Sequence, residues 1–259
     1  MIGPTVRLLV DGPLPGATNM AVDEALMEGA RRGQPSLRLY RWSPGCLSFG
    51  RNQTARDRYD GDRVGSLGYD VVRRPTGGRS VLHHREVTYA VVAPEEWGSL
   101  SDAYLRINRA LANGLRELGV AATVHEASAG PAPRPTVRAC FRDPLPGELT
   151  SGGRKLAGSA QWRFRGALLQ HGSLLLHNDQ ALVETFRSDA PPRLEIPAVG
   201  LVELLGREPE PGELESAIAA GFERELGVEV VPGDLTDEEL ERVAVLRPKY
   251  EDPAWTWRR

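Results

Sequence analysis

Lysine is nearly absent from this 259-residue chain. Of its 32 basic residues only Lys155 and Lys249 are lysines, and the rest are arginines. An ammonium group is a compact donor that can lose its proton when buried, whereas a guanidinium stays charged and needs a wide planar slot. A rare lysine therefore indicates a position that arginine does not suit, and Lys155, in the segment GGRKLAGSAQ at residues 152–161, becomes a candidate functional group. The alternative is a solvated lysine in a hairpin.

Cysteine and long apolar runs are also scarce. The two cysteines, Cys46 and Cys140, lie far apart in sequence, so we expect two free thiols rather than a disulfide framework or a zinc site, and no metal. No window approaches 18 apolar residues, and the first residues, MIGPTVR, contain no basic region that leads into an apolar stretch. We therefore expect a cytoplasmic protein that does not span a membrane.

Neither sign of charge dominates. A formal net charge of -3 with 41% hydrophobic residues excludes the positive excess of a nucleic-acid-binding protein and the composition of a disordered chain. The charges are nevertheless segregated, because thirteen acidic residues and two arginines fall between Glu203 and Glu241. A basic patch on an acidic protein is suited to an anionic ligand or partner. Basic residues cluster around the glycine-rich segments, at Arg73, Arg74, Arg79, Arg154, Lys155, Arg163 and Arg165.

The hydrophobic pattern predicts the α+β class. Residues 18–27 have helical spacing, a second helix is expected between a cap at Ser101 and a stop at Gly119, and acidic helices are expected at 211–226 and 236–246. We expect residues 1–259 to form a single domain with a mixed or antiparallel sheet flanked by helices, on which the acidic helical part of about 199–259 packs. Strand-like runs occupy residues 37–40, 46–49, 71–74, 87–92, 149–151, 155–160 and 167–176, the last three with meander-like turns between them.

The first candidate site is the segment VVRRPTGGRSVLHH at residues 71–84. A strand there runs into Pro-Thr-Gly-Gly, where missing side chains let backbone N–H groups approach a ligand, and a second strand follows. The flanking arginines are suited to hold a phosphate or a carboxylate. A bare Gly-Gly pair is more often a plain hairpin turn, and His83 alone is more often structural. The combination of these groups in one short segment favours a ligand site.

The second candidate is Cys140, which follows a proline-rich loop at residues 129–135. Cys46, in the apolar run GCLSF, has the surroundings of a buried structural cysteine. Cys140 lies instead between Arg138 and Arg142. A positive environment favours the thiolate, the form that attacks a carbonyl carbon, although a structural role remains the alternative.

The third candidate combines residues 155–161 with the segment QHGSLLL at 170–176. Small residues at 157–160 leave room beside a strand for a slim apolar chain, and tight strand packing would explain them equally well. Packing does not explain the lysine, the glutamine and the histidine that accompany them.

Together these segments resemble the lipoate-protein ligase and octanoyltransferase superfamily, which shares a core with the biotin-protein ligases. The resemblance implies the fold of the catalytic domain of those ligases, with residues 1–259 as a single catalytic domain. It is carried by NMAVDEAL at 19–26, LRLYRW at 37–42, RRPTGG at 73–78, GRKLAGSAQ at 153–161 and QHGS at 170–173.

Within the superfamily, the chain resembles the Gram-positive type of octanoyl-acyl carrier protein:protein octanoyltransferase. That type has a mid-chain cysteine, which Cys140 matches, and Arg79 stands where ligases usually have a third glycine. The close of the chain, PKY at 248–250 with Trp255, is similar to the short ending of the transferases. One departure is His84, where the family usually has an acidic residue.

The resemblance implies that octanoyl passes from acyl carrier protein to a lysine of a lipoyl-domain protein, either the glycine-cleavage H protein or a 2-oxoacid dehydrogenase E2, by a thioester on Cys140 assisted by Lys155. No cofactor, nucleic acid or membrane is implied, and we expect a monomer. Three alternatives stay open: an ATP-dependent lipoate or biotin ligase, a lipoyl or octanoyl amidotransferase, and a non-catalytic acyl-binding homologue. The residues expected to bind the substrate are Arg73, Arg74, Thr76, Gly77, Gly78, Arg79, His83, Ala157, Gly158, Ser159, Ala160, Gln161, His171 and Gly172.

Overall fold

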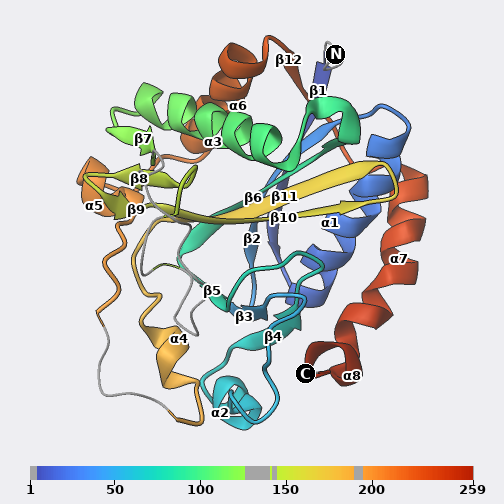
Figure 1. The fold of residues 1–259 in the computed structure, drawn as a ribbon, viewed down its shortest axis with the longest axis vertical. Helices are drawn as coiled ribbons and strands as arrows, with labels where there is room; N and C mark the ends of the chain where they lie inside the picture. Colours follow the sequence, from blue (N-terminus) through green and yellow to red (C-terminus); the bar gives the residue numbers. More distant parts are fainter. Residues whose placement is uncertain (1–4, 126–140, 142–144, 190–194, 259) are drawn as a thin grey trace.

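A six-stranded sheet forms the centre of the protein (Figure 1). The computed structural model describes residues 5–125, 141, 145–189 and 195–258. β1 pairs in parallel with β2 and β12, whereas the β2–β6, β6–β11 and β10–β11 pairs are antiparallel. The sheet is therefore mixed, which confirms the predicted fold class. In the order β10-β11-β6-β2-β1-β12, the strands are Ala157–Phe164, Ala167–Leu175, Glu86–Pro94, Ser36–Trp42, Thr5–Leu14 and Glu229–Pro232.

Helices cover both faces of this sheet. α3 (Leu100–Glu117) and α6 (Glu213–Leu226) pack together on one face, and α1 (Gly16–Arg31) and α7 (Asp237–Glu251) pack together on the other (Figure 1). Because alternate side chains of a strand point to opposite faces, β11 contributes to two cores. Leu168 joins the core under α3 and α6, while Leu169 joins the core under α1 and α7.

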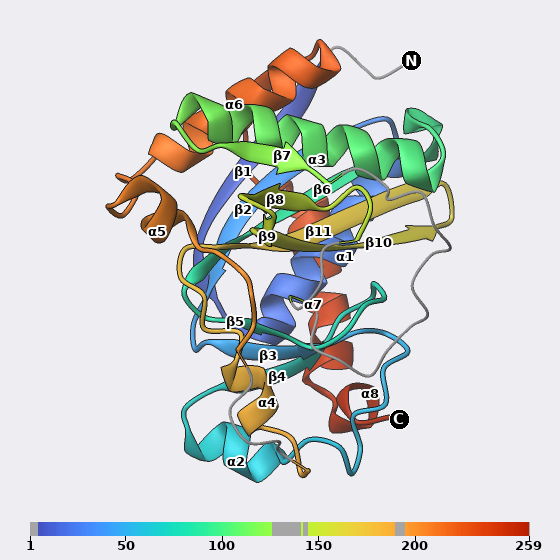
Figure 2. The same ribbon diagram turned by 60° about the vertical axis from the view of Figure 1, so that its left-hand side comes forward.

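Two three-stranded sheets flank the central one (Figure 2), and they carry the Gly-Gly turn and Lys155, whereas residues 157–161, 171 and 172 of the predicted site lie on β10 and β11 of the central sheet. The first has the order β4-β3-β5, with β4 (Asp70–Arg73), β3 (Cys46–Phe49) and β5 (Val81–His83). The second has the order β7-β8-β9, with β7 (Ala122–Val124), β8 (Leu149–Ser151) and β9 (Arg154–Lys155). The shorter helices are α2 (Gly61–Ser66), α4 (Leu182–Thr185), α5 (Leu201–Leu205) and α8 (Pro253–Thr256).

The structure corrects three local predictions. The cap of α3 is Ser99 rather than Ser101, because Asp102 completes a reciprocal capping box with Ser99. The predicted strand at 155–160 is divided at Leu156 between β9 and β10, which belong to different sheets. The strand β1 was not predicted: its pairing with β2 shifts between Val10 and Pro13, an irregularity that accommodates the glycine and proline of this segment.

Among the described helices, none is long and apolar enough to cross a bilayer.

Candidate active site

The Gly-Gly turn between β4 and β5 is held from inside by a buried arginine. The Arg74 guanidinium donates to the carbonyl oxygens of Ser48, Gly77 and Arg79 at 3.0, 3.1 and 2.8 Å. The turn also requires glycine across from it, because a Cβ on Gly50 would lie 2.0 Å from the carbonyl oxygen of Gly78. Arg74 therefore sets the shape of the turn.

Arg73 ties the same turn to the end of the chain. Its side chain is fully buried, and Nε donates to the carbonyl oxygen of Thr256 at 2.9 Å. In return, Trp255 Nε1 donates to the carbonyl oxygen of Arg73 at 2.9 Å. Nη1 of Arg73 donates to the carbonyl oxygens of Gly50 and Gln53, both at 2.7 Å. These contacts hold Arg73 against the protein backbone, and its contact with a ligand stays a prediction.

A narrow cavity of about 30 Å³ lies between this turn and the β10–β11 pair. It has room for about two water molecules, at 10–15 Å³ each. Eight of the predicted substrate-binding residues line it together: Arg74, Gly78, His83, Gly158, Ser159, Ala160, His171 and Gly172. Six lining residues were not among those expected to bind the substrate, although all but Thr88 lie in segments that the sequence analysis quoted: Met20, Tyr40, Trp42, Val81, Thr88 and Ser173.

His171 connects this cavity to a buried charge network. Its Nδ1 lies 2.8 Å from Asp23 Oδ2, and its Nε2 lies 2.7 Å from Thr76 Oγ1. Asp23 also accepts hydrogen bonds from Arg38 Nη1 and from the Tyr40 hydroxyl, both at 2.8 Å. Burial opposes ionisation of Asp23, but the hydrogen bond from His171 and the charge of Arg38 outweigh it and lower the pKa of Asp23. An ionised Asp23 fixes the His171 ring by accepting from Nδ1–H.

His83, the second histidine of the cavity, is buried between an aromatic ring and hydrogen-bonding side chains. Its ring stacks on Trp42 with centroids 4.1 Å apart, and Nε2 lies 2.7 Å from Ser48 Oγ. Burial lowers the pKa of His83, and the hydrogen bond with Glu86 opposes this effect only in part. His83 is therefore neutral at pH 7. His84, by contrast, is exposed and lies 2.9 Å from Asp179.

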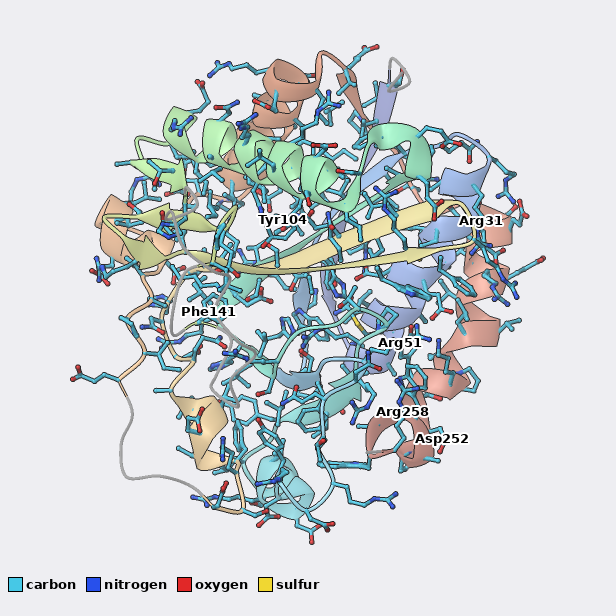
Figure 3. All side chains as sticks on the ribbon, in the orientation of Figure 1. Arg31, Arg51, Tyr104, Phe141, Asp252 and Arg258 are labelled. Carbon is cyan, nitrogen blue, oxygen red and sulfur yellow. The ribbon has the colours of Figure 1, made fainter. Side chains whose placement is uncertain are left out.

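Lys155 is buried, which excludes the solvated-hairpin alternative. Its side chain is 1% exposed, and Nζ lies 2.7 Å from Oε1 of Glu148, whose side chain is 6% exposed. Nζ also lies 5.4 Å from the ring centroid of Phe141, the residue that follows Cys140 in sequence. Phe141 is labelled in Figure 3, to the left below the β10–β11 hairpin. Cys140 itself lies outside the described residues.

The remaining predicted residues lie around the cavity rather than in its wall. Thr76 reaches the cavity through His171, and Gln161 lines a different groove, beside Tyr104 of α3. Their contact with a substrate stays a prediction, as it does for the cavity residues. Cys46 is a free, buried thiol whose pKa is raised well above 9.0 by its burial, as expected of a structural cysteine.

The sequence analysis did not identify Asp23 or Glu148 as functional candidates. Asp23 lies within a predicted helix and Glu148 precedes a short strand, so neither was singled out by its local pattern. The available signal was indirect. A buried arginine, lysine or histidine needs a carboxylate, Asp23 lies in the segment 19–26 that carries the family resemblance, and Glu148 stands seven positions before Lys155.

Comparisons with known proteins show the family of this chain. Residues 15–223 match the family model of the lipoyl protein ligase A/B catalytic domain. The chain belongs to this family. Octanoyltransferase LipM of Moorella thermoacetica is 42% identical, with 98% of each chain covered. The octanoyltransferase LipM of Kyrpidia tusciae is 44% identical over 98% of this chain and 99% of the relative.

Solved structures confirm the predicted fold. A lipoate-protein ligase A bound with ATP superposes with a TM-score of 0.81 at 23% identity, with 98% of each chain covered. A bipartite lipoate protein ligase from Thermoplasma acidophilum gives a TM-score of 0.78 at 23% identity, over 98% of this chain and 96% of the ligase. The predicted resemblance to the superfamily and to its Gram-positive octanoyltransferase type is thus confirmed.

Proposed function

We propose that this protein is an octanoyltransferase of lipoate biosynthesis that acts through a thioester on Cys140. Octanoyl transfer is supported by relatives of that name which match nearly the whole chain. The observation that carries the mechanism is the burial of Lys155 beside Phe141, the neighbour of Cys140 in sequence. In this proposal the donor is octanoyl-acyl carrier protein, and the acceptor is a lysine of a lipoyl-domain protein, such as the glycine-cleavage H protein or an E2.

The reaction has two balanced steps. In the first, the Cys140 thiolate attacks the thioester carbonyl of the donor, a new C–S bond forms, and the pantetheine thiolate leaves and takes up a proton. In the second, the neutral amine of the acceptor lysine attacks the octanoyl-enzyme. The C–N amide bond forms, the Cys140 C–S bond breaks, and the amine proton returns the cysteine to its thiol form. The Lys155 ammonium donates a hydrogen bond to the acyl carbonyl oxygen, where negative charge develops.

The octanoyl chain occupies the cavity between the turn and β10. Each buried methylene contributes about 0.8 kcal/mol, so an eight-carbon acyl group gains roughly 5 kcal/mol, enough to select for chain length. A cavity of about 30 Å³ is too small for this chain. Entry therefore requires lining side chains to turn aside, and Met20 is suited to do so because methionine has three flexible torsions.

The acidic carrier protein docks beside this cavity on the half-buried Arg51 and the exposed Arg31 and Arg165, not on Arg73 and Arg74, which are buried. Arg51 lies over the ring of Trp162 at 5.1 Å, and its backbone N–H donates to the carbonyl oxygen of Thr76 in the turn. The guanidinium groups of Arg31 and Arg165 lie 5.8 and 4.9 Å from the ring of Phe164, which stacks on Trp162. Figure 3 shows Arg31 and Arg51 along the same side of the molecule, near the β10–β11 hairpin.

Intact mass spectrometry tests the proposal directly. The protein is incubated with octanoyl-acyl carrier protein in the absence of ATP, alongside Cys140→Ala and the matched control Cys46→Ala. We expect an octanoyl adduct, released by hydroxylamine, on the wild type and on Cys46→Ala, and none on Cys140→Ala. An adduct that persists in Cys140→Ala would refute the nucleophile.

The same experiment separates the alternatives. No adduct on any variant, with modification of the acceptor only when ATP and free acid are added, would identify a ligase. Transfer only from an acylated lipoyl-domain protein would identify an amidotransferase, and octanoyl binding without transfer would identify a non-catalytic homologue. The proposal also retains a cytoplasmic location and a monomeric state, which cell fractionation and size-exclusion chromatography test.

A further inference from the structure

Glu148 holds Lys155 and the backbone of Leu145 with its two carboxylate oxygens. Its Oε1 accepts a hydrogen bond from Lys155 Nζ at 2.7 Å, and its Oε2 accepts one from the backbone N–H of Leu145, also at 2.7 Å. Leu145 stands five positions after Cys140 in the sequence. One buried carboxylate therefore binds both the lysine and the backbone of Leu145.

The position of Glu148 is itself fixed by three elements. The turn that leads to it is closed by the Glu148 N–H, which donates to the carbonyl oxygen of Leu145 at 3.0 Å. Asn108 of α3 donates to the carbonyl oxygen of Gly147 at 2.8 Å, and the His125 N–H, next to β7, donates to the carbonyl oxygen of Glu148 at 2.8 Å. A carboxylate anchored in this way is preorganised, because hydrogen bonds from Asn108 and His125 hold the backbone on which it stands.

Burial makes the ion pair necessary for the lysine. An isolated ammonium taken out of water is strongly destabilised, and a carboxylate in contact with it compensates for the lost hydration. The ring of Phe141 offers only a weaker cation–π contact at 5.4 Å. Without the Glu148 carboxylate, Lys155 would lose a charged partner that lies 2.7 Å from Nζ.

We propose that Glu148 is a positioning residue of the acyl transfer: it holds the Lys155 ammonium toward the acyl carbonyl while its second oxygen binds the backbone N–H of Leu145. This inference rests on the proposed function, since it acts through Lys155 and Cys140. It assigns Lys155 the role of hydrogen-bond donor rather than that of a base. Glu148 itself touches neither the acyl group nor the acceptor, so its effect on the reaction passes entirely through Lys155 and the backbone of Leu145.

Glu148→Gln tests the inference with little change in shape. The glutamine keeps an oxygen for the Leu145 N–H and removes the charge that faces Lys155. We expect the single-turnover rate of octanoyl-enzyme formation and kcat to fall at least tenfold, while KM for the donor changes less than twofold, because the cavity and the docking arginines are untouched. Glu148→Asp, which keeps the charge on a shorter side chain, should recover part of the rate.

The matched control is Glu203→Gln, which removes the exposed pair between Glu203 and Arg154, the residue beside Lys155. We expect it to retain the wild-type rate. A double-mutant cycle with Lys155→Met then shows whether Glu148 acts through the lysine. In the Lys155→Met background, Glu148→Gln should cause less than a twofold further loss.

The possible results are distinct. If the wild type forms the Cys140 thioester and Glu148→Gln forms it at the same rate, the positioning role is wrong and the proposed function stands. If the losses of the two variants multiply, Glu148 does not act through Lys155, and the inference is equally overturned. If the wild type forms no thioester on Cys140, the proposed function fails before the variants are compared. If circular dichroism shows that Glu148→Gln does not fold, the rate of octanoyl-enzyme formation by Glu148→Asp is compared with that of the wild type instead. An unchanged rate in Glu148→Asp, whose carboxylate is displaced from Lys155, would contradict the inference.

Discussion

The substitution Asp23→Asn should have a large effect on stability that depends on pH. Asp23 is fully buried and holds Arg38 Nη1, the Tyr40 hydroxyl and His171 Nδ1, each at 2.8 Å. Asparagine keeps the shape but removes the negative charge, and its amide group would face N–H and O–H donors. Among the described residues, the carboxylate left beside the buried Arg38 is Asp11, whose side chain is 25% exposed. Removing one partner of a buried ion pair costs about 3–5 kcal/mol, and we expect the free energy of unfolding at pH 7 to fall by that amount.

Urea denaturation of the wild type and the variant measures this loss. Glu238→Gln is the matched control, because it removes the exposed pair with Arg32 between α7 and α1 and should cost no more than about 1 kcal/mol. The folded-state pKa of Asp23 is lowered, so its contribution to stability is complete above the ordinary value of 3.8 and is lost as pH falls through the lower folded-state value. The difference between wild type and Asp23→Asn should therefore narrow below about pH 4. The reasoning would be refuted if Asp23→Asn lowered the free energy of unfolding by less than about 1 kcal/mol at pH 7. It would also be refuted if the difference in this free energy between wild type and variant did not narrow in acid.

Three further predictions concern the site. Lys155→Arg should reduce the rate at which the octanoyl adduct forms at least tenfold despite the preserved charge, because the larger guanidinium does not fit the place of an ammonium 2.7 Å from Glu148. A wild-type rate of adduct formation, measured by intact mass spectrometry, would exclude Lys155 from the mechanism. Gly172→Ala should lower the free energy of unfolding, measured by urea denaturation, by about 1–3 kcal/mol, because its Cβ would lie 2.6 Å from the carbonyl oxygen of Gly158. The control Gly65→Ala should cause no loss in the same assay, because a Cβ at Gly65 meets nothing within 4 Å. Raising ionic strength should lower kcat/KM for octanoyl-acyl carrier protein but not for a neutral octanoyl thioester such as octanoyl-N-acetylcysteamine. Arg51→Ser should weaken this salt dependence. Equal salt effects on both donors would argue against docking on the arginines.

The local patterns of the sequence predicted much of the fold, and apart from the cap of α3, which a capping box places at Ser99, they failed mainly where distant contacts decide. The strand Cys46–Phe49 and the helical stop at Gly119 were predicted correctly, because apolar patterning and a glycine with positive φ act locally. The pairing of Lys155 with Glu148 was not predicted, because a sequence shows that a lysine is unusual but not which carboxylate faces it. The hydrogen bonds of Arg73 and Arg74 to carbonyl oxygens were not predicted either, because they depend on chain segments that meet only in the folded protein, and the contact of both arginines with a ligand stays a prediction.

The contact between Arg73 and the end of the chain has a consequence for how the enzyme is made. The residues that it joins, Arg73 and Thr256, are 183 positions apart, and the first strand, β1, pairs with β12 near the end. Ribosomes add about 5–20 residues per second, so the Gly-Gly turn waits roughly 10–40 s for its last support to be synthesised. Until α8 has left the ribosome, the nascent chain lacks this support of the turn, and transfer activity should appear only after α8 has been synthesised.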